Sequence, residues 1–188
     1  MGDLRTKRTY KLLKDSLLKL LSEQSFDNIK VNDICEVAMV HRTTFYSHFN
    51  DKYELLDYVI NETEKDIVGE ISMSNIDSPR SFYTKLISNV LDYLESNKLF
   101  FRSIIQHNYS TGIFTVIHNY TIKQLKNLFE VQEQNGIKID VPISVIAEFY
   151  SGAVTSTIIW WLQSNSKVTK KDLEKYIVNL VFENPLEI

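Results

Sequence analysis

Hydrophobic residues recur along most of the chain at the three- and four-residue spacing of amphipathic helices. Residues 4–22 show this spacing on one face, and short segments at 31–38 and 42–48 follow. The three residues between these short segments cannot reverse the chain into an antiparallel pair of long helices, but they suit the sharp crossing of a helix-turn-helix. The same periodicity predicts further helices at 51–72, 79–96, 99–107, 112–134, 143–164 and 169–184.

Capping residues support these boundaries. Asn50 or Asp51 can accept a hydrogen bond from a free amide at the start of the fourth helix. Thr169 and Asp172 have the spacing of a capping box at the start of the last one. The pattern predicts about nine helices and no convincing strand, so we expect an all-α fold. A three-helix head at 1–50 would carry a six-helix body at 51–188.

The segment 145–162 is apolar, with Glu148 as its only charged residue. Its length approaches that of a membrane-spanning helix, but a helix that is apolar on nearly every face can equally be buried between two copies of the chain. We favour a homodimer formed through about 143–184, with no membrane contact. Trp160 and Trp161 would supply buried area, and close approach would be allowed by the small residues Gly152, Ala153 and Ser156.

Composition excludes several function classes. Apolar residues make up 44% of the 188 residues and charged ones 24%, the balance of a compact globular protein. The five glycines never cluster, so neither a dinucleotide-binding turn nor a phosphate-binding loop can be drawn. The single cysteine and the lack of an apolar leader make the cytoplasm the expected compartment. The net charge is −3, but residues 1–50 carry 8 basic and 6 acidic side chains, a basic head on an acidic body.

Residues 29–56 read IKVNDICEVAMVHRTTFYSHFNDKYELL. This stretch resembles the N-terminal helix-turn-helix of the TetR family of bacterial transcription regulators, and its FYSHFNDKYELL portion is similar to a group that includes activators of dihydroxyacetone kinase genes. Three positions depart from the family pattern. Lys30 replaces the threonine at the start of the second helix, Met39 replaces the turn glycine, and His41 replaces the serine that opens the third helix. Met39 would therefore need a conformation that glycine adopts at less cost, and Lys30 cannot cap as threonine would.

The resemblance implies a DNA-binding head. A recognition helix needs polar side chains at its beginning to reach base edges in the major groove, which Arg42 and its two neighbours provide. Tyr46 can donate to a phosphate or simply pack in the core, and the resemblance implies a phosphate contact for Lys52. Phosphate contacts set affinity, and base contacts set sequence preference. The predicted DNA-binding residues are Lys30, Asn32, Arg42, Thr43, Thr44, Tyr46, His48 and Lys52.

Other conspicuous residues have structural interpretations. Phe45 and Phe49 lie four residues apart and are expected in the core, as is Cys35 as a small buried hydrophobe. The four histidines have no carboxylates or cysteines beside them at ligand spacing, so we expect no metal site. No set of nucleophile, base and orienting group can be assembled, and we expect no cofactor and no enzyme.

The family resemblance also implies an effector cavity in the body, mostly apolar with a few polar groups. Core packing explains most of the aromatic residues there equally well, so no ligand identity follows. The candidate effector-binding residues are Tyr83, Phe100, Phe101, Phe114, His118 and Tyr150.

We therefore expect a cytoplasmic, homodimeric, sequence-specific regulator that binds double-stranded DNA at a palindromic operator and acts as a repressor responsive to a small molecule. The helix at 51–72 would be its lever, because it belongs to both parts. One alternative is a helical adaptor or co-activator that binds a protein partner and has lost DNA binding. Another is a small helical enzyme that uses His107 or His118, for which no motif is present.

Overall fold

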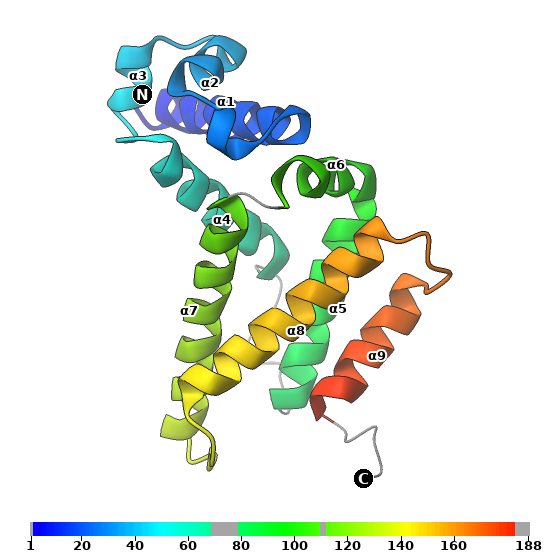
Figure 1. Ribbon diagram of the computed structural model, residues 1–188. Coiled ribbons are helices and arrows are strands. Elements are labelled where there is room, and N and C mark those ends of the chain that lie inside the picture. The colour runs from blue at the N-terminus through cyan, green and yellow to red at the C-terminus, as the bar shows by residue number, and fades with distance from the viewer. Residues whose placement is uncertain (1, 69–78, 110–111, 183–188) are drawn as a thin grey trace. The chain divides into compact units, whose positions relative to one another are not determined.

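The computed structural model describes residues 2–68, 79–109 and 112–182 (Figure 1). Over these residues the chain forms nine α-helices and one short 3₁₀ helix, η1. The helices are α1 (Gly2–Glu23), α2 (Val31–Ala38), α3 (Arg42–Tyr46), α4 (Lys52–Val68), α5 (Pro79–Ser96), α6 (Lys98–Asn108), α7 (Gly112–Gln134), α8 (Ile143–Gln163) and α9 (Lys170–Phe182), with η1 at Phe26–Asn28.

The all-α prediction is confirmed, and most helix boundaries fall within two residues of those expected. Two details differ over the described residues. The third helix ends at Tyr46 instead of residue 48, and the pattern gave no sign of η1, which is too short to show a period. The expected end of the fourth helix, at residue 72, lies outside the described residues.

The chain divides into two compact units. Unit 1 comprises Met1–Gly69 and Leu99–Ile113, and unit 2 comprises Glu70–Lys98 and Phe114–Ile188. The boundary proposed from the sequence at residue 50 therefore falls inside unit 1, which includes α4 and also takes in α6 from much later in the chain.

Unit 1 has its core between α1, α2, α3 and α4, and α1 lies directly against α2 (Figure 1). The apolar face of α1 accounts for much of this core, since Leu13 and Leu17 have no exposed surface. Phe45 is fully buried and Phe49 nearly so, as their spacing predicted. Tyr10 packs its ring against Phe49, with the ring centroids 5.0 Å apart. These contacts fix the short helices α2 and α3, which are too short to be stable alone.

Asn108, the last residue of α6, joins that helix to the head. Its side chain is completely buried; Oδ1 accepts a hydrogen bond from the Phe26 amide at 2.7 Å, and Nδ2 donates to the Leu21 carbonyl at 3.0 Å. The Ser103 hydroxyl adds a 2.7 Å bond to the Ser22 carbonyl at the end of α1. These bonds satisfy backbone groups that the end of α1 would otherwise leave without partners.

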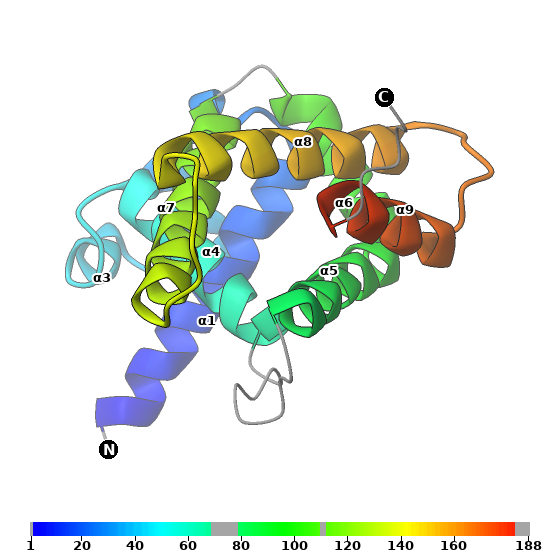
Figure 2. The same cartoon turned by 90° about the horizontal axis from the view of Figure 1, so that it is seen from below.

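Unit 2 contains α5, α7, α8 and α9, which Figure 2 shows from below. Helices α5 and α9 lie side by side, joined by an ion pair between Lys170 and Asp92. The predicted capping box is present at the start of α9, where the Thr169 hydroxyl donates to the Asp172 carboxylate at 2.6 Å and accepts from the Asp172 amide at 3.2 Å.

The two tryptophans of α8 have different environments. Trp161 is 2% exposed, donates from Nε1 to the Val168 carbonyl and lies under the Lys98 ammonium, 4.2 Å from the ring centroid. Trp160 is 50% exposed. The expectation that both supply area to a partner chain is therefore wrong for Trp161, because that ring is already buried in its own chain.

Helix α8 is, among the described residues, the one helix long and apolar enough to cross a membrane by length and composition alone. A single helix of this kind is weak evidence for a membrane span, because a helix buried in a soluble assembly has the same composition.

Candidate nucleic-acid interface and effector cavity

The turn between α2 and α3 contains the backbone strain that the missing glycine implied. Met39 adopts the left-handed conformation, with φ 54° and ψ 42°, and its amide donates to the Glu36 carbonyl. This conformation costs an L-residue about 1–2 kcal/mol. The Met39 side chain is 93% exposed, so no packing in the chain offsets the strain.

Helix α3 places polar side chains on its outer face. Arg42 and Thr43 are exposed and Thr44 is half-buried. Tyr46, 49% exposed, does not pack in the core. Instead its ring lies 5.7 Å from the Arg42 guanidinium carbon, and its hydroxyl is 3.5 Å from an Arg42 nitrogen, at the long limit of a hydrogen bond. Arg42 and Tyr46 therefore form one exposed cation–π pair on the outer face of α3.

The start of α2 adds two more predicted DNA-binding residues, Lys30 and Asn32, and both are exposed. Lys30 occupies the N-cap position, but its side chain provides no capping bond. The cap comes instead from Asp33, whose carboxylate accepts the Lys30 amide at 2.8 Å. The Lys30 ammonium is thus not needed to hold the helix.

Lys52 lies against the backbone of η1. Its ammonium donates to three backbone carbonyls around η1, those of Phe26 at 2.7 Å, Ile29 at 2.9 Å and Asp27 at 3.2 Å. It also lies 4.6 Å from the centroid of the Phe26 ring. Burial lowers the pKa of Lys52, and the Asp27 and Asp33 carboxylates oppose this effect.

An ammonium has three N–H donors, so the three carbonyls already use all the donors of Lys52. A phosphate contact, which the resemblance implies for this residue, would have to compete with these three bonds. Sequence inspection missed the role in η1 because the acceptors are backbone atoms more than twenty positions earlier.

His48 follows α3 and is half-buried. Its ring meets the Tyr10 ring edge to face, with centroids 5.1 Å apart. This contact fixes the orientation of the imidazole from α1 and leaves part of the ring exposed.

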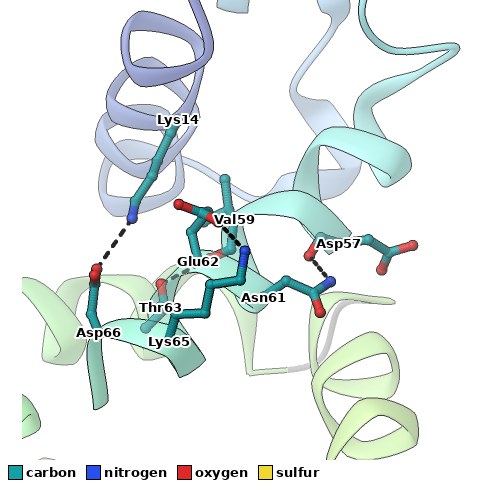
Figure 3. A network of polar contacts seen from close by, with 8 residues as sticks. All are labelled: Lys14, Asp57, Val59, Asn61, Glu62, Thr63, Lys65 and Asp66. Atoms are coloured by element: carbon teal, nitrogen blue, oxygen red, sulfur yellow. Dashed lines mark hydrogen bonds and ion pairs between the residues drawn. The ribbon is translucent and has the colours of Figure 1, made fainter. Parts of the chain in front are cut away.

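Helix α1 carries Lys7, Lys11 and Lys14 on one face, but they are not equivalent. Lys7 and Lys11 are exposed. Lys14 points across to Asp66 on α4, 3.4 Å away, as Figure 3 shows. In the preceding turn of α4, Lys65 pairs with Glu62 at 2.7 Å in the same view. Lys14 therefore links α1 to α4, whereas Lys7 and Lys11 lie at the exposed end of this face of α1.

Unit 2 contains a cavity of about 340 Å³ between its four helices. Tyr83 comes from α5, Thr121 from α7, and Tyr150 and Ser151 from α8. The remaining described lining residues are mostly aliphatic or aromatic: Leu86, Ile87, Val90, Leu125, Phe129, Val154, Thr155, Ile158, Val181 and Phe182.

Two of the six candidate effector residues, Tyr83 and Tyr150, line this cavity. His118 lies just behind the wall, with Nδ1 3.2 Å from the Ser151 hydroxyl. Phe114 on α7 is not among the described lining residues. Phe100 and Phe101 belong to α6 in unit 1 and pack edge to face against each other, with centroids 5.5 Å apart.

Tyr83 is the unusual polar group of the cavity. Its hydroxyl is buried and has no hydrogen-bond partner within the described part of the chain. Burial, with a smaller contribution from Tyr150, raises the pKa of Tyr83 to about 12. The phenol therefore keeps its proton across the physiological pH range and remains a donor.

Three residues that sequence reasoning did not assemble meet at the cavity wall, which Ser151 itself lines. His118 on α7 lies between Ser151 and Glu148, and its Nε2 is 3.2 Å from the Glu148 carboxylate. The order resembles that of a nucleophile, base and orienting acid, but Ser151 lies mid-helix, where the backbone amides are engaged in the helix and cannot stabilise an oxyanion. Glu148 and Ser151 are three residues apart on one helix face, and this spacing is the sequence feature that could have indicated the cluster.

The outer face of α8 is apolar and exposed. Val145, Phe149 and Trp160 recur at helical spacing and are each at least half exposed. Gly152 and Ser156 lie on the same face and are also exposed. Helix α9 also has exposed apolar side chains, Tyr176 and Leu180, which lie four residues apart.

Comparison with known proteins identifies both parts of the chain. Residues 15–59 match the family described as "Bacterial regulatory proteins, tetR family", and residues 81–183 match the family described as "Transcriptional regulator C-terminal region". The second match alone spans more than half of the chain. The proteins of both families are transcription regulators and not enzymes.

Two curated relatives match about half of this chain. An uncharacterised helix-turn-helix regulator of Bacillus subtilis (strain 168), YxbF, is 32% identical over 95 residues, which are 50% of this chain and 24% of the relative. DhaS, named as the transcriptional activator of the dhaKLM operon of Lactococcus lactis subsp. lactis (strain IL1403), is 25% identical over 96 residues, 51% of this chain and 48% of the relative. The matched parts thus span half or less of these relatives.

A solved structure shows the same fold over nearly the whole chain. A TetR-family regulator from Syntrophomonas wolfei str. Goettingen is 17% identical and has a TM-score of 0.68, over 93% of each chain.

Proposed function

Because the chain belongs to the TetR family of bacterial transcription regulators, we propose that it binds a palindromic DNA operator as a homodimer and responds to a small molecule. The observation that carries this proposal is the outer face of α3, where Arg42, Thr43 and Tyr46 are exposed while Phe45 is buried. That division holds the helix rigidly and leaves its polar side chains available to a groove.

The residues divide into two roles. Arg42, Thr43 and Thr44, in the first turn of α3, contact base edges, because the beginning of a recognition helix comes closest to the groove floor. Arginine can bind guanine with two hydrogen bonds. The phosphate contacts come from the residues around this helix, Lys30, Asn32, Tyr46 and His48.

Dimerisation uses the exposed apolar face of α8 together with that of α9. A face containing Phe149 and Trp160 would be costly to leave in water, and a second copy of the chain covers it through a two-fold axis. Two heads related by such an axis reach successive major grooves roughly 34–36 Å apart, so the operator is an inverted repeat.

The cavity in unit 2 is the effector site. An effector that favours one separation of the two heads shifts operator occupancy, and a coupling of about 1–3 kcal/mol changes affinity 5- to 150-fold. The protein acts in the cytoplasm and represses transcription where its operator overlaps a promoter. DhaS is named an activator, so the position of the operator decides the sign of regulation.

Selection of the full chain against a pool of random duplexes tests DNA recognition. We expect an enriched inverted repeat and binding that weakens steeply with added salt. Arg42→Ala should change the preferred bases, whereas Lys30→Ala should weaken all duplexes about equally. Failure to enrich any sequence at low salt would refute the DNA-binding proposal and favour the adaptor.

Sedimentation of the same preparation tests the dimer. The wild-type chain should sediment as a dimer at micromolar concentration, and Phe149→Glu should sediment as a monomer because it buries a charge in the proposed interface. Tyr109→Glu, a substitution at an exposed residue directly after α6 in unit 1, is the matched control and should leave the dimer intact. A monomeric wild-type chain would contradict the proposal.

A further inference from the structure

The residues that line the cavity of unit 2 disfavour charged ligands. None of its described lining residues is acidic, basic or a histidine, and most are aliphatic or aromatic. A ligand with a carboxylate or phosphate would lose its hydration there without gaining a counter-charge, and this loss is unfavourable. The wall therefore favours an uncharged occupant.

Three of the hydroxyl groups in the wall already have partners in the protein. The Tyr150 hydroxyl donates to the Val181 carbonyl at 3.3 Å, and the Thr121 hydroxyl donates to the Ile117 carbonyl at 2.9 Å. The Ser151 hydroxyl is shared with Nδ1 of His118. When Nε2 carries the ring proton and donates to Glu148, Nδ1 accepts a hydrogen bond from the Ser151 hydroxyl.

The Tyr83 hydroxyl in the cavity wall is different. Among the described residues it is the buried side-chain polar group that has no hydrogen-bond partner. A buried donor without an acceptor is destabilising, and a ligand that supplies the acceptor recovers that loss on binding. Sites built to hydrogen-bond a ligand in this way discriminate strongly against analogues that lack the matching group.

We propose that the cavity binds an uncharged, largely apolar molecule that carries a carbonyl-type acceptor, and that Tyr83 recognises this acceptor. The inference rests on the proposed effector role of the cavity and specifies the chemistry of its ligand. A volume of about 340 Å³ lies at the small end of small-molecule sites, which suits a molecule of one or two rings. Sugar phosphates, nucleotides and carboxylic acids are excluded as ligands.

Three probes of nearly equal shape separate these properties. Benzophenone is an uncharged two-ring ketone, diphenylmethane lacks the carbonyl, and 4-benzoylbenzoate adds a carboxylate. Calorimetric titration of the full chain without DNA should show benzophenone binding at least about tenfold more tightly than either analogue.

Two variants test whether Tyr83 causes the preference for benzophenone over diphenylmethane. In Tyr83→Phe, benzophenone and diphenylmethane should bind with equal affinity, because the donor is gone and the apolar wall remains. Tyr109→Phe makes the same substitution at an exposed residue in unit 1 and should keep the wild-type preference. Irradiated benzophenone should also cross-link to peptides of α5, α7 and α8 that line the cavity.

The proposal is overturned if benzophenone fails to bind up to its solubility limit, if 4-benzoylbenzoate binds as tightly, if cross-links map to unit 1, or if Tyr83→Phe keeps the ketone preference. Should Tyr83→Phe fail to fold, the ranking of the three probes on the wild-type chain and the cross-links decide. These titrations contain no DNA, so the two proposals can fail separately. If operator selection fails but the probes rank as expected, only the DNA-binding proposal is refuted. If selection succeeds but the probes do not rank as expected, only the proposed ligand class is refuted.

Discussion

Replacing Lys52 with Met removes an ammonium group but keeps a side chain of similar length. In the native head this ammonium donates to the carbonyls of Phe26, Ile29 and Asp27. A hydrogen bond to a charged group contributes about 1.5–3 kcal/mol. Desolvation of the ammonium, which lowers the pKa of Lys52, offsets part of the sum of three such bonds. We therefore expect Lys52→Met to lower the free energy of unfolding by about 2–3 kcal/mol.

Urea unfolding followed by circular dichroism measures this loss, and operator titrations at several salt concentrations measure phosphate contacts. Because all three donors of Lys52 are used inside the head, Lys52→Met should leave the salt dependence unchanged. The matched control Lys30→Met should keep the stability within about 0.5 kcal/mol and reduce the salt slope by about 1. Wild-type stability with a reduced slope in Lys52→Met would refute our reasoning, because the ammonium would then pair with a phosphate.

Three further predictions concern stability, each measured by urea unfolding. Met39→Gly should raise the free energy of unfolding by about 0.5–1 kcal/mol, because relief of the left-handed strain exceeds the added freedom of the unfolded chain; a loss would contradict this. Asn108→Ala should cost about 2–4 kcal/mol, because the Phe26 amide loses its buried acceptor, and a neutral effect would refute the role assigned to Asn108. Above pH 10 the Tyr83 phenol ionises in the unfolded state, while in the folded state its pKa is about 12. Stability should therefore fall between pH 10 and 12 in the wild type more steeply than in Tyr83→Phe, and parallel curves would contradict this.

The helix-turn-helix could be predicted from sequence because its determinants are local. Spacing alone assigned Phe45 and Phe49 to the core, and both are buried. The family pattern has a glycine at the turn between α2 and α3, and that resemblance predicted that Met39 adopts a conformation more favourable for glycine, as its positive φ shows. Asp51 caps α4 as expected, accepting the Tyr53 and Glu54 amides at 2.8 and 2.9 Å.

The cavity was predictable only in part, because its wall combines residues from four helices. Aromatic composition found Tyr83 and Tyr150, but it could not separate them from Phe100 and Phe101, which are also aromatic and belong to a different unit. Composition also cannot reveal that a hydroxyl lacks a partner. The absence of a partner for Tyr83 depends on where the other hydroxyls of the wall direct their protons, which is a property of the three-dimensional arrangement.

Asn108 shows why the extent of the head could not be derived from pattern. A polar residue at the end of a short helix ordinarily indicates a solvent-facing position, whereas this side chain is completely buried. Its bonds join residues more than eighty positions apart, and no periodicity encodes a contact at that separation. The lever expected from sequence was α4 alone, because the sequence pattern assigns this helix to both parts of the chain. The bonds of Asn108 and Ser103 attach α6 to the end of α1 as well, so the structural unit that includes the DNA-binding helices extends to a segment that sequence reasoning assigned to the body.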